Sequence, residues 1–373
     1  MNAKRSWSIV LLSAVLLIAA RQTPIASPRG QSFIPGIPTV IKTSVVLTKA
    51  IAIPGAPLAS TDLIWADEAS KRVFFSDRSN FAVDIIDAAT DTYAGRVTGF
   101  AGAAGGGGPN GLLVTPDNKL WAGDGNSLVQ VVDLNLNPPR IIQSINVGGS
   151  NRADELGYDP DDHIILIGSD RETPPFLTAI SADTYRVLAK IPFPEASGME
   201  QPIWDDQLHR FFVNVPTARG AEVAAVDPKT LTVAGIYPVG SSACGTGLTL
   251  GPFQRLLVAC GSPFIVNAVN GHVINTVTDV GSGDEVWYNA GDGQFYVTST
   301  DRSGATVLGV IDGQTGAWRQ NVVAPGARNP AALASNNHIY TVVRSPAAGT
   351  ADTTLCTQFN IRDSGCVGVF THR

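Results

Sequence analysis

After its first forty positions the chain shows short runs of alternating apolar and polar residues, and helical spacing of apolar residues is scarce. These runs are rich in β-branched and aromatic residues, and clusters of Gly, Pro, Asn and Asp separate them. Alternation with a period of two is typical of half-buried β-strands, and such clusters are typical of turns. The pattern therefore predicts an all-β protein.

A module of about 45 residues repeats along the chain. Each copy has a polar residue, an apolar strand, an Asp-rich turn, a second strand and a third strand, as in DLIWADEASKRVFFSDRSNFAVDIID and DEVWYNAGDGQFYVTSTDRSGATVLGVID. Successive leading residues lie 48, 44, 46, 45, 39 and 45 positions apart. The leading residues are Asp62, Asn110, Asp154, Glu200, Gly245, Asp284 and Asn329. This period is typical of four-stranded propeller blades of about 40 to 50 residues, so seven modules predict a seven-bladed β-propeller.

The last module is one strand short, since it ends at its third strand (CVGVF) with only three residues left. An alternating segment, TSVVLTKAIAI from Thr43 to Ile53, precedes the first module and has no blade of its own. A closed ring of sheets leaves no blade incomplete. We therefore expect this N-terminal strand to join the last blade and close the ring.

The N-terminal region reads as a targeting segment. Lys4 and Arg5 precede an apolar run from Ile9 to Ala20, which is the layout of a secretory signal peptide. The run is shorter than the roughly 20 residues that cross a bilayer, and a proline-rich stretch follows it. We expect a secreted or periplasmic protein with no membrane span after cleavage. The predicted parts are a signal peptide (1–20), an extended leader (21–42) and a single propeller domain (43–373).

Charge and cysteine content narrow the function. The net charge is −6 with a pI of about 5.4, and no cluster of Lys and Arg is present, which argues against nucleic-acid partners. Four cysteines in an exported chain favour disulfides over metal thiolates. Three pairings are open to them. Each of two predicted hairpins is flanked by two cysteines, which favours Cys244 with Cys260 and Cys356 with Cys366.

Carboxylate and amide side chains should gather at one mouth of the central channel, because the leading residues precede the channel-lining strand of each blade. Their mutual repulsion raises pKa values unless a cation or a set of donors compensates it. Ca²⁺ suits such oxygen ligands. Three alternatives are open: a divalent cation, a metal-free site for a polar ligand, or residues that cap strand ends and never converge. The candidate metal ligands are Asn110, Asp154, Glu155, Glu200, Asp284 and Glu285. Three tryptophans, Trp65, Trp204 and Trp287, lie close behind these positions and serve either blade packing or sugar stacking.

Two resemblances bear on function. The repeats VDIIDAATDTYAGRV, VAAVDPKTLTVAGIY and LGVIDGQTGAWRQNV resemble the YVTN or YncE-like seven-bladed propellers. That group implies a non-catalytic binding protein of the periplasm or cell surface.

Separately, Pro109-Asn110-Gly111-Leu112 followed by Thr115-Pro116-Asp117-Asn118 resembles a stretch of gluconolactonase and strictosidine-synthase-like propellers. In the gluconolactonase branch a divalent ion, held by one Glu, two Asn and one Asp, polarises a lactone or ester carbonyl. Only Asn110 carries over by motif, and that family has six blades.

Two functions follow as expectations. The first is a metal-assisted hydrolase of small lactones or esters, in which Glu155 or Glu285 acts as general base to a water. The alternative is a non-catalytic exported propeller. In either case the channel mouth would take a small-molecule ligand, or a partner protein or glycan.

Overall fold

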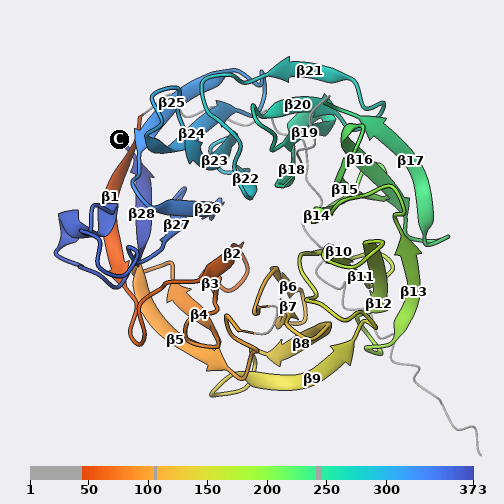
Figure 1. Cartoon of the computed structure of the whole chain (residues 1–373), viewed down its shortest axis with the longest axis horizontal. Coiled ribbons are helices and arrows are strands. Elements are labelled where there is room, and N and C mark those ends of the chain that lie inside the picture. Colours follow the sequence, from red (N-terminus) through yellow and green to blue (C-terminus); the bar gives the residue numbers. More distant parts are fainter. Residues whose placement is uncertain (1–43, 105–106, 241–245) are drawn as a thin grey trace, which may run out of the picture. The chain divides into compact units, whose positions relative to one another are not determined.

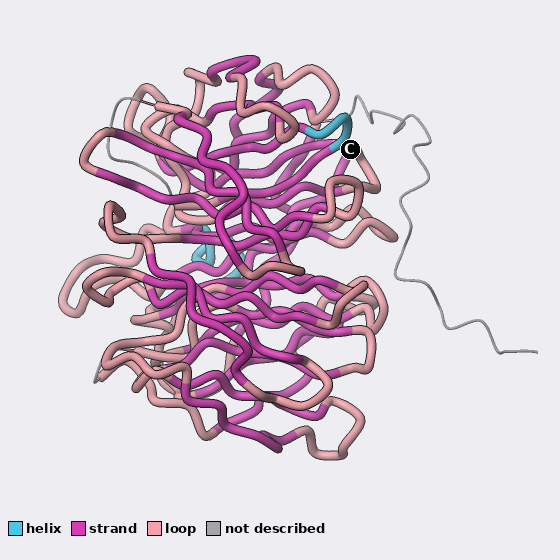
Figure 2. Tube along the Cα trace, turned by 90° about the vertical axis from the view of Figure 1, so that its right-hand side faces the viewer, coloured by secondary structure: helices cyan, strands magenta, loops and turns pink. Residues whose placement is uncertain are grey.

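The computed structural model describes residues 44–104, 107–240 and 246–373, which form seven four-stranded antiparallel sheets arranged in a ring (Figure 1). The described residues include no α-helix. The predicted seven-bladed β-propeller is therefore confirmed. Loops gather at two opposite faces of the ring, with the strands between them (Figure 2).

The blades follow one another in sequence, and each runs from the channel outward. Blades one and two are β2 (Thr61–Asp67), β3 (Arg72–Asp77), β4 (Ala82–Asp87), β5 (Thr92–Thr98), then β6 (Leu112–Thr115), β7 (Lys119–Asp124), β8 (Leu128–Asp133), β9 (Arg140–Asn146). Blades three and four are β10 (Leu156–Asp159), β11 (Ile164–Ser169), β12 (Phe176–Ser181), β13 (Val187–Pro192), then β14 (Glu200–Asp205), β15 (Arg210–Thr217), β16 (Gly220–Asp227), β17 (Thr232–Pro238). Blades five and six are β18 (Leu248–Gly251), β19 (Arg255–Val258), β20 (Phe264–Asn267), β21 (Val273–Thr276), then β22 (Val286–Asn289), β23 (Gln294–Thr300), β24 (Thr306–Asp312), β25 (Trp318–Val323). Blade seven is β26 (Ala327–Ala332), β27 (Ile339–Val343), β28 (Cys366–His372) and β1 (Val45–Ala52).

Burial along a blade explains its sequence. A second strand such as β11 (IILIGS) is buried throughout, because neighbouring blades cover both of its faces. A fourth strand such as β13 (VLAKIP) is mostly exposed and carries polar residues. The hydrophobic core lies between blades: Phe75 of blade one and Tyr340 of blade seven, for example, share one buried cluster.

The N-terminal strand closes the ring as expected. Strand β1 pairs antiparallel with β28, so that Val45 lies opposite His372 and Ile51 opposite Val367 (Figure 1). The side chain of Gln320 in blade six also holds this strand, since it accepts from the Val45 N–H at 3.0 Å and donates to the Val45 carbonyl at 2.9 Å. The first and last described strands thus belong to one blade.

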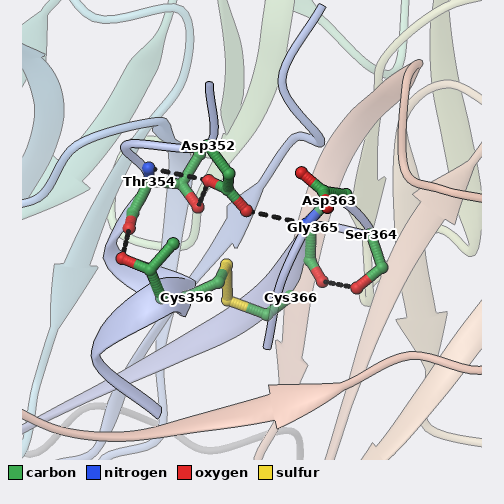
Figure 3. Close-up of a disulfide and its surroundings, with 8 residues drawn as sticks. Asp352, Thr354, Cys356, Asp363, Ser364, Gly365 and Cys366 are labelled. Carbon is green, nitrogen blue, oxygen red and sulfur yellow. Dashed lines mark hydrogen bonds between the residues drawn. A yellow bond between two sulfur atoms is a disulfide. The ribbon is translucent and has the colours of Figure 1, made fainter. Parts of the chain in front are cut away.

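The disulfide between Cys356 and Cys366 is present (Figure 3). Its predicted hairpin is wrong, however, because Cys356 lies in the short 3-10 segment Leu355–Phe359 (η2) rather than in a strand. Asp352 fixes this loop by accepting from the Thr354 N–H at 2.9 Å and from the Asp363 N–H at 2.8 Å. The loop is held in place where the third strand of blade seven begins.

Several predictions fall outside the described residues. Cys260 is not a free thiol, but its predicted partner Cys244 is not among the described residues, so this pairing stays a prediction. The predicted signal peptide (1–20) and leader (21–42) are not described either. In the part of the chain that the structure does describe, no helix has the length and apolar character to cross a membrane.

Candidate functional site

The mouth of the central channel brings together the ends of two strands from each blade. The second strand of a blade runs antiparallel to the first, so the residue after it lies beside the residue that precedes the first strand. Arg78, Asp170 and Arg344 follow β3, β11 and β27 in this way, and Arg152 lies shortly before β10. Sequence reasoning missed Arg78, Asp170 and Arg344 because it considered only the entry to each first strand. It missed Arg152, which lies at such an entry, because it considered only carboxylates and amides there.

Arg78 occupies the side of the mouth formed by blades one and two. Its guanidinium forms an ion pair with Asp62 and donates to the side-chain oxygen of Asn110. The Asn110 amide nitrogen donates to the Ala153 carbonyl at 2.6 Å. Asn110 is fully buried, and both ends of its side chain are hydrogen-bonded. Asn110 therefore joins three blades, and its oxygen faces an arginine.

Arg152 lies among the carboxylates of blade three. It donates to both oxygens of Asp170, at 3.1 and 2.8 Å, and forms an ion pair with Asp154. Burial alone would lower the pKa of this guanidinium, but the neighbouring carboxylates, led by Asp154, raise it overall. Arg152 is thus a permanent counter-ion inside the mouth.

Three carboxylates in this region have the spacing of a metal site. Asp154, Asp170 and Glu200 each place one oxygen within 4.8 Å of the other two. Burial, followed by the charges of neighbouring carboxylates, raises the pKa of Asp154 and of Glu200 well above the usual range. Asp154 and Glu200 belong to the predicted ligand set, whereas Asp170 does not. We call these three residues the carboxylate triad.

Glu155 and Glu285 meet across the channel from blades three and six, whose inner strands β10 and β22 lie on opposite sides of the ring (Figure 1). Both residues are buried, and their carboxyl groups lie close enough to influence each other's pKa. Burial raises the pKa of Glu155 well above its usual range, and the charge of Glu285 raises it further. Burial likewise raises the pKa of Glu285. Burial and a neighbouring carboxyl group both favour the protonated form, so the environment of this pair favours a bound proton.

Gln201 directly follows Glu200 in β14, and its side chain links three blades. It sits at a β-bulge after Glu200, with a φ of 44°. Its side-chain oxygen accepts from the Leu248 N–H at 2.7 Å, and its side-chain nitrogen donates to the Val286 carbonyl at 3.1 Å. The amide therefore reaches from blade four to blades five and six beneath the mouth.

The remaining predicted residues lie at the edge of the mouth. Asp284 is exposed and lines a cavity of about 340 Å³ together with serine and threonine hydroxyls. Asn329 lines the same cavity, is buried, and donates to the Asp62 carbonyl at 3.4 Å. In blade five, Gly245 lies outside the described residues, while Thr246 donates to the Gly283 carbonyl. Blade five thus adds no carboxylate among the described residues at this mouth.

No protein-family model matches the chain, and no curated protein sequence matches it significantly. The class that the fold defines, a seven-bladed β-propeller with an acidic channel mouth, is therefore the basis for any functional proposal.

Proposed function

We propose that this protein is an exported propeller whose channel mouth binds a divalent cation, with Ca²⁺ the best candidate, and through it an oxygen-bearing ligand. The spacing of the carboxylate triad (Asp154, Asp170 and Glu200) is the observation that carries this proposal. Ca²⁺ takes six to eight oxygen ligands at 2.3 to 2.6 Å. Three protein oxygens would leave positions open for water and for a ligand.

The charge balance of the mouth supports the same proposal. Carboxyl groups outnumber guanidinium groups by seven to five, and one proton on the carboxyl groups does not remove the excess. The carboxyl groups are Asp62, Asp154, Glu155, Asp170, Glu200, Asp284 and Glu285, and the guanidinium groups are Arg78, Arg152, Arg171, Arg328 and Arg344. A bound cation would relieve the repulsion that protonation now relieves. Cation binding should therefore release protons and strengthen as the pH rises.

A catalytic use of the ion is a second candidate, and the Glu155–Glu285 pair favours it. An ion on the triad would polarise a lactone or ester carbonyl. A carboxyl group with a raised pKa is suited to exchange a proton with water near neutral pH. Asn110 argues for a ligand set unlike that of the gluconolactonase branch, because its oxygen accepts from Arg78.

A non-catalytic binding propeller is the alternative to the hydrolase. It is supported by the resemblance of the repeats to YVTN or YncE-like propellers, and by Arg78 and Arg152, which already compensate part of the acidic charge. In this case the partner would be a small molecule, a protein or a glycan at the mouth. The Cys356–Cys366 disulfide supports export to an oxidising compartment, either secreted or periplasmic.

Titration calorimetry with Ca²⁺ tests cation binding. Wild-type protein should bind one ion and bind it more tightly at pH 8 than at pH 6. Glu200→Gln should weaken binding at least tenfold, because it removes one charged ligand. Glu195→Gln is the matched control, since Glu195 lies five residues away with its side chain 72% exposed. Equal heats for wild type and Glu200→Gln, or no binding at either pH, would overturn the proposal.

A substrate panel then separates hydrolase from binding protein. Small lactones and esters would be assayed with Ca²⁺, Mg²⁺, Mn²⁺ and Zn²⁺, beside Glu155→Gln and Glu285→Gln. The hydrolase predicts metal-dependent turnover and a loss in kcat of about 10² or more in at least one variant, the usual scale for a general base. Cation binding without turnover on any substrate would favour the binding protein.

A further inference from the structure

The cavity of about 340 Å³ at the edge of the mouth lies between blades six and seven. Blade six contributes hydroxyl groups to its wall, and Asp284 lies just before that blade's first strand. Blade seven contributes the start of β26, including Arg328 and Asn329. We call this space the rim cavity. Its volume lies within the range of small-molecule sites, about 300 to 1,000 Å³.

Three threonines of blade six line one wall of the rim cavity. Thr300 lies opposite Thr306 in the pairing of β23 with β24, and Thr298 lies opposite Leu308. Paired residues, and residues two apart along a strand, have their side chains on one face of a sheet. Leu308 packs in a buried cluster with Ala327 of blade seven. The face that carries the three hydroxyl groups therefore points toward blade seven.

The hydroxyl of Thr298 points to a ligand. Thr298 is only 6% exposed, yet its hydroxyl has no hydrogen-bond partner among the described residues. This hydroxyl is not closed off from solvent, in contrast to the unpartnered hydroxyl of Thr341. Polar groups of buried side chains are nearly always hydrogen-bonded. The Thr298 hydroxyl is therefore placed to bond a molecule that enters the rim cavity.

Two opposite charges line the rim cavity without pairing. Asp284 and Arg328 are both exposed, and neither side chain has an ion pair or a hydrogen bond among the described residues. Arg328 lies opposite Val342, two residues before Arg344. Burial lowers the pKa of Arg344, and the charge of Arg328 lowers it further. A carboxylate bound to Arg328 would relieve this repulsion between the two guanidinium groups.

We propose that the rim cavity binds a small zwitterion, an α-amino acid with a polar side chain, whose carboxylate pairs with Arg328 and whose ammonium group pairs with Asp284. The hydroxyl of Thr298 would bond the polar side chain of the ligand. An anion without an amine would be repelled by Asp284, and a cation without a carboxylate would be repelled by Arg328. The rim cavity shares no residue with the carboxylate triad, so this inference goes beyond cation binding and does not depend on it.

Calorimetry with four polar amino acids, L-serine, L-threonine, L-asparagine and L-glutamine, tests this inference on the full chain. At least one of them should bind at one site per chain, and chelation of divalent cations should leave its Kd unchanged. The α-hydroxy acid of the same structure lacks the ammonium group, and the carboxamide lacks the carboxylate. Each should bind about fivefold or more weakly, because hydrogen bonds to charged groups are the stronger ones.

Two variants assign the charges. Asp284→Asn should weaken binding of the amino acid about fivefold but not that of the α-hydroxy acid, and Arg328→Gln should weaken binding of the amino acid but not that of the carboxamide. Thr298→Val removes the hydroxyl at nearly constant volume and should weaken binding about threefold. Arg186→Gln and Asp206→Asn are the matched controls, because both residues are exposed and lie in turns at the opposite face of the ring.

Melting temperatures would establish that each variant is folded. Three results would overturn the inference. The first is no saturable binding of any of the four amino acids, and the second is the same Kd for the wild type and for both charge variants. The third is loss of binding on chelation, which would place the ligand on a cation at the mouth instead.

Discussion

Removal of the closing strand should unfold the propeller rather than trim a tail. A chain that starts at residue 54 lacks Val45, Ile51 and Ile53, which are 1%, 5% and 6% exposed. Each buried aliphatic side chain contributes about 1.5 to 3 kcal/mol, so the three together contribute about 5 to 9 kcal/mol. Total stabilities are about 5 to 15 kcal/mol. The truncation therefore removes much or all of the stability, and it also exposes β28 as an unpaired edge.

The assay compares this chain with one that starts at residue 44, which retains β1. The longer chain should unfold cooperatively on heating and in urea. The shorter one should aggregate or show no cooperative transition, and a peptide of residues 44–53 added in excess should restore folding. A milder variant, Ile51→Ala, should cost about 2 to 5 kcal/mol, as large-to-small core substitutions do. Equal melting temperatures for the two chains would refute the closure argument.

Two further predictions concern the mouth. The pKa values of Glu155 and Glu285 are raised on folding, so in chelator the native state binds more protons than the unfolded state, and stability should fall as the pH rises above about 4.5. Glu285→Gln should lessen this loss between pH 5 and pH 8 in urea titrations, because a neutral amide cannot repel Glu155; an unchanged pH dependence would count against the pair. Gly123→Ala places a Cβ 2.0 Å from the Asp154 carbonyl oxygen. This should destabilise the protein by about 1 to 3 kcal/mol and weaken Ca²⁺ binding, whereas Gly235→Ala, with its nearest atom at 3.5 Å, should do neither.

The fold could be predicted from the sequence because each blade is specified by local features, namely the alternation of its strands and the residues of its turns. Alternating strands and Asp-rich turns recur at a regular spacing, and a ring that lacks one strand requires the segment around Val45 to Ala52. The predicted hairpin around Cys356 was wrong, because the 3-10 segment found there depends on hydrogen bonds such as those of Asp352 rather than on alternation.

The site was predictable only in part. Residues that enter each first strand were found by counting, and Glu155 and Glu285 do meet at the mouth. Arg78 and Arg344 were missed because they lie at the ends of second strands, and the distance from the start of a first strand to such an end varies between blades. Arg152 precedes β10, but only carboxylates and amides were considered at that position. The bulge at Gln201 could not be predicted either, because it does not change the alternation of apolar and polar residues. Which donor faces which carboxylate is decided by side-chain direction, which spacing does not specify.

A crystal structure of the protein grown with Ca²⁺ tests the central claim most directly. The account predicts one ion at the channel mouth, 2.3 to 2.6 Å from oxygens of Asp154, Asp170 and Glu200, with Arg152 moved away from at least one of the two aspartates. A mouth that contains only water, with Arg152 still paired to both aspartates as it is here, would contradict it.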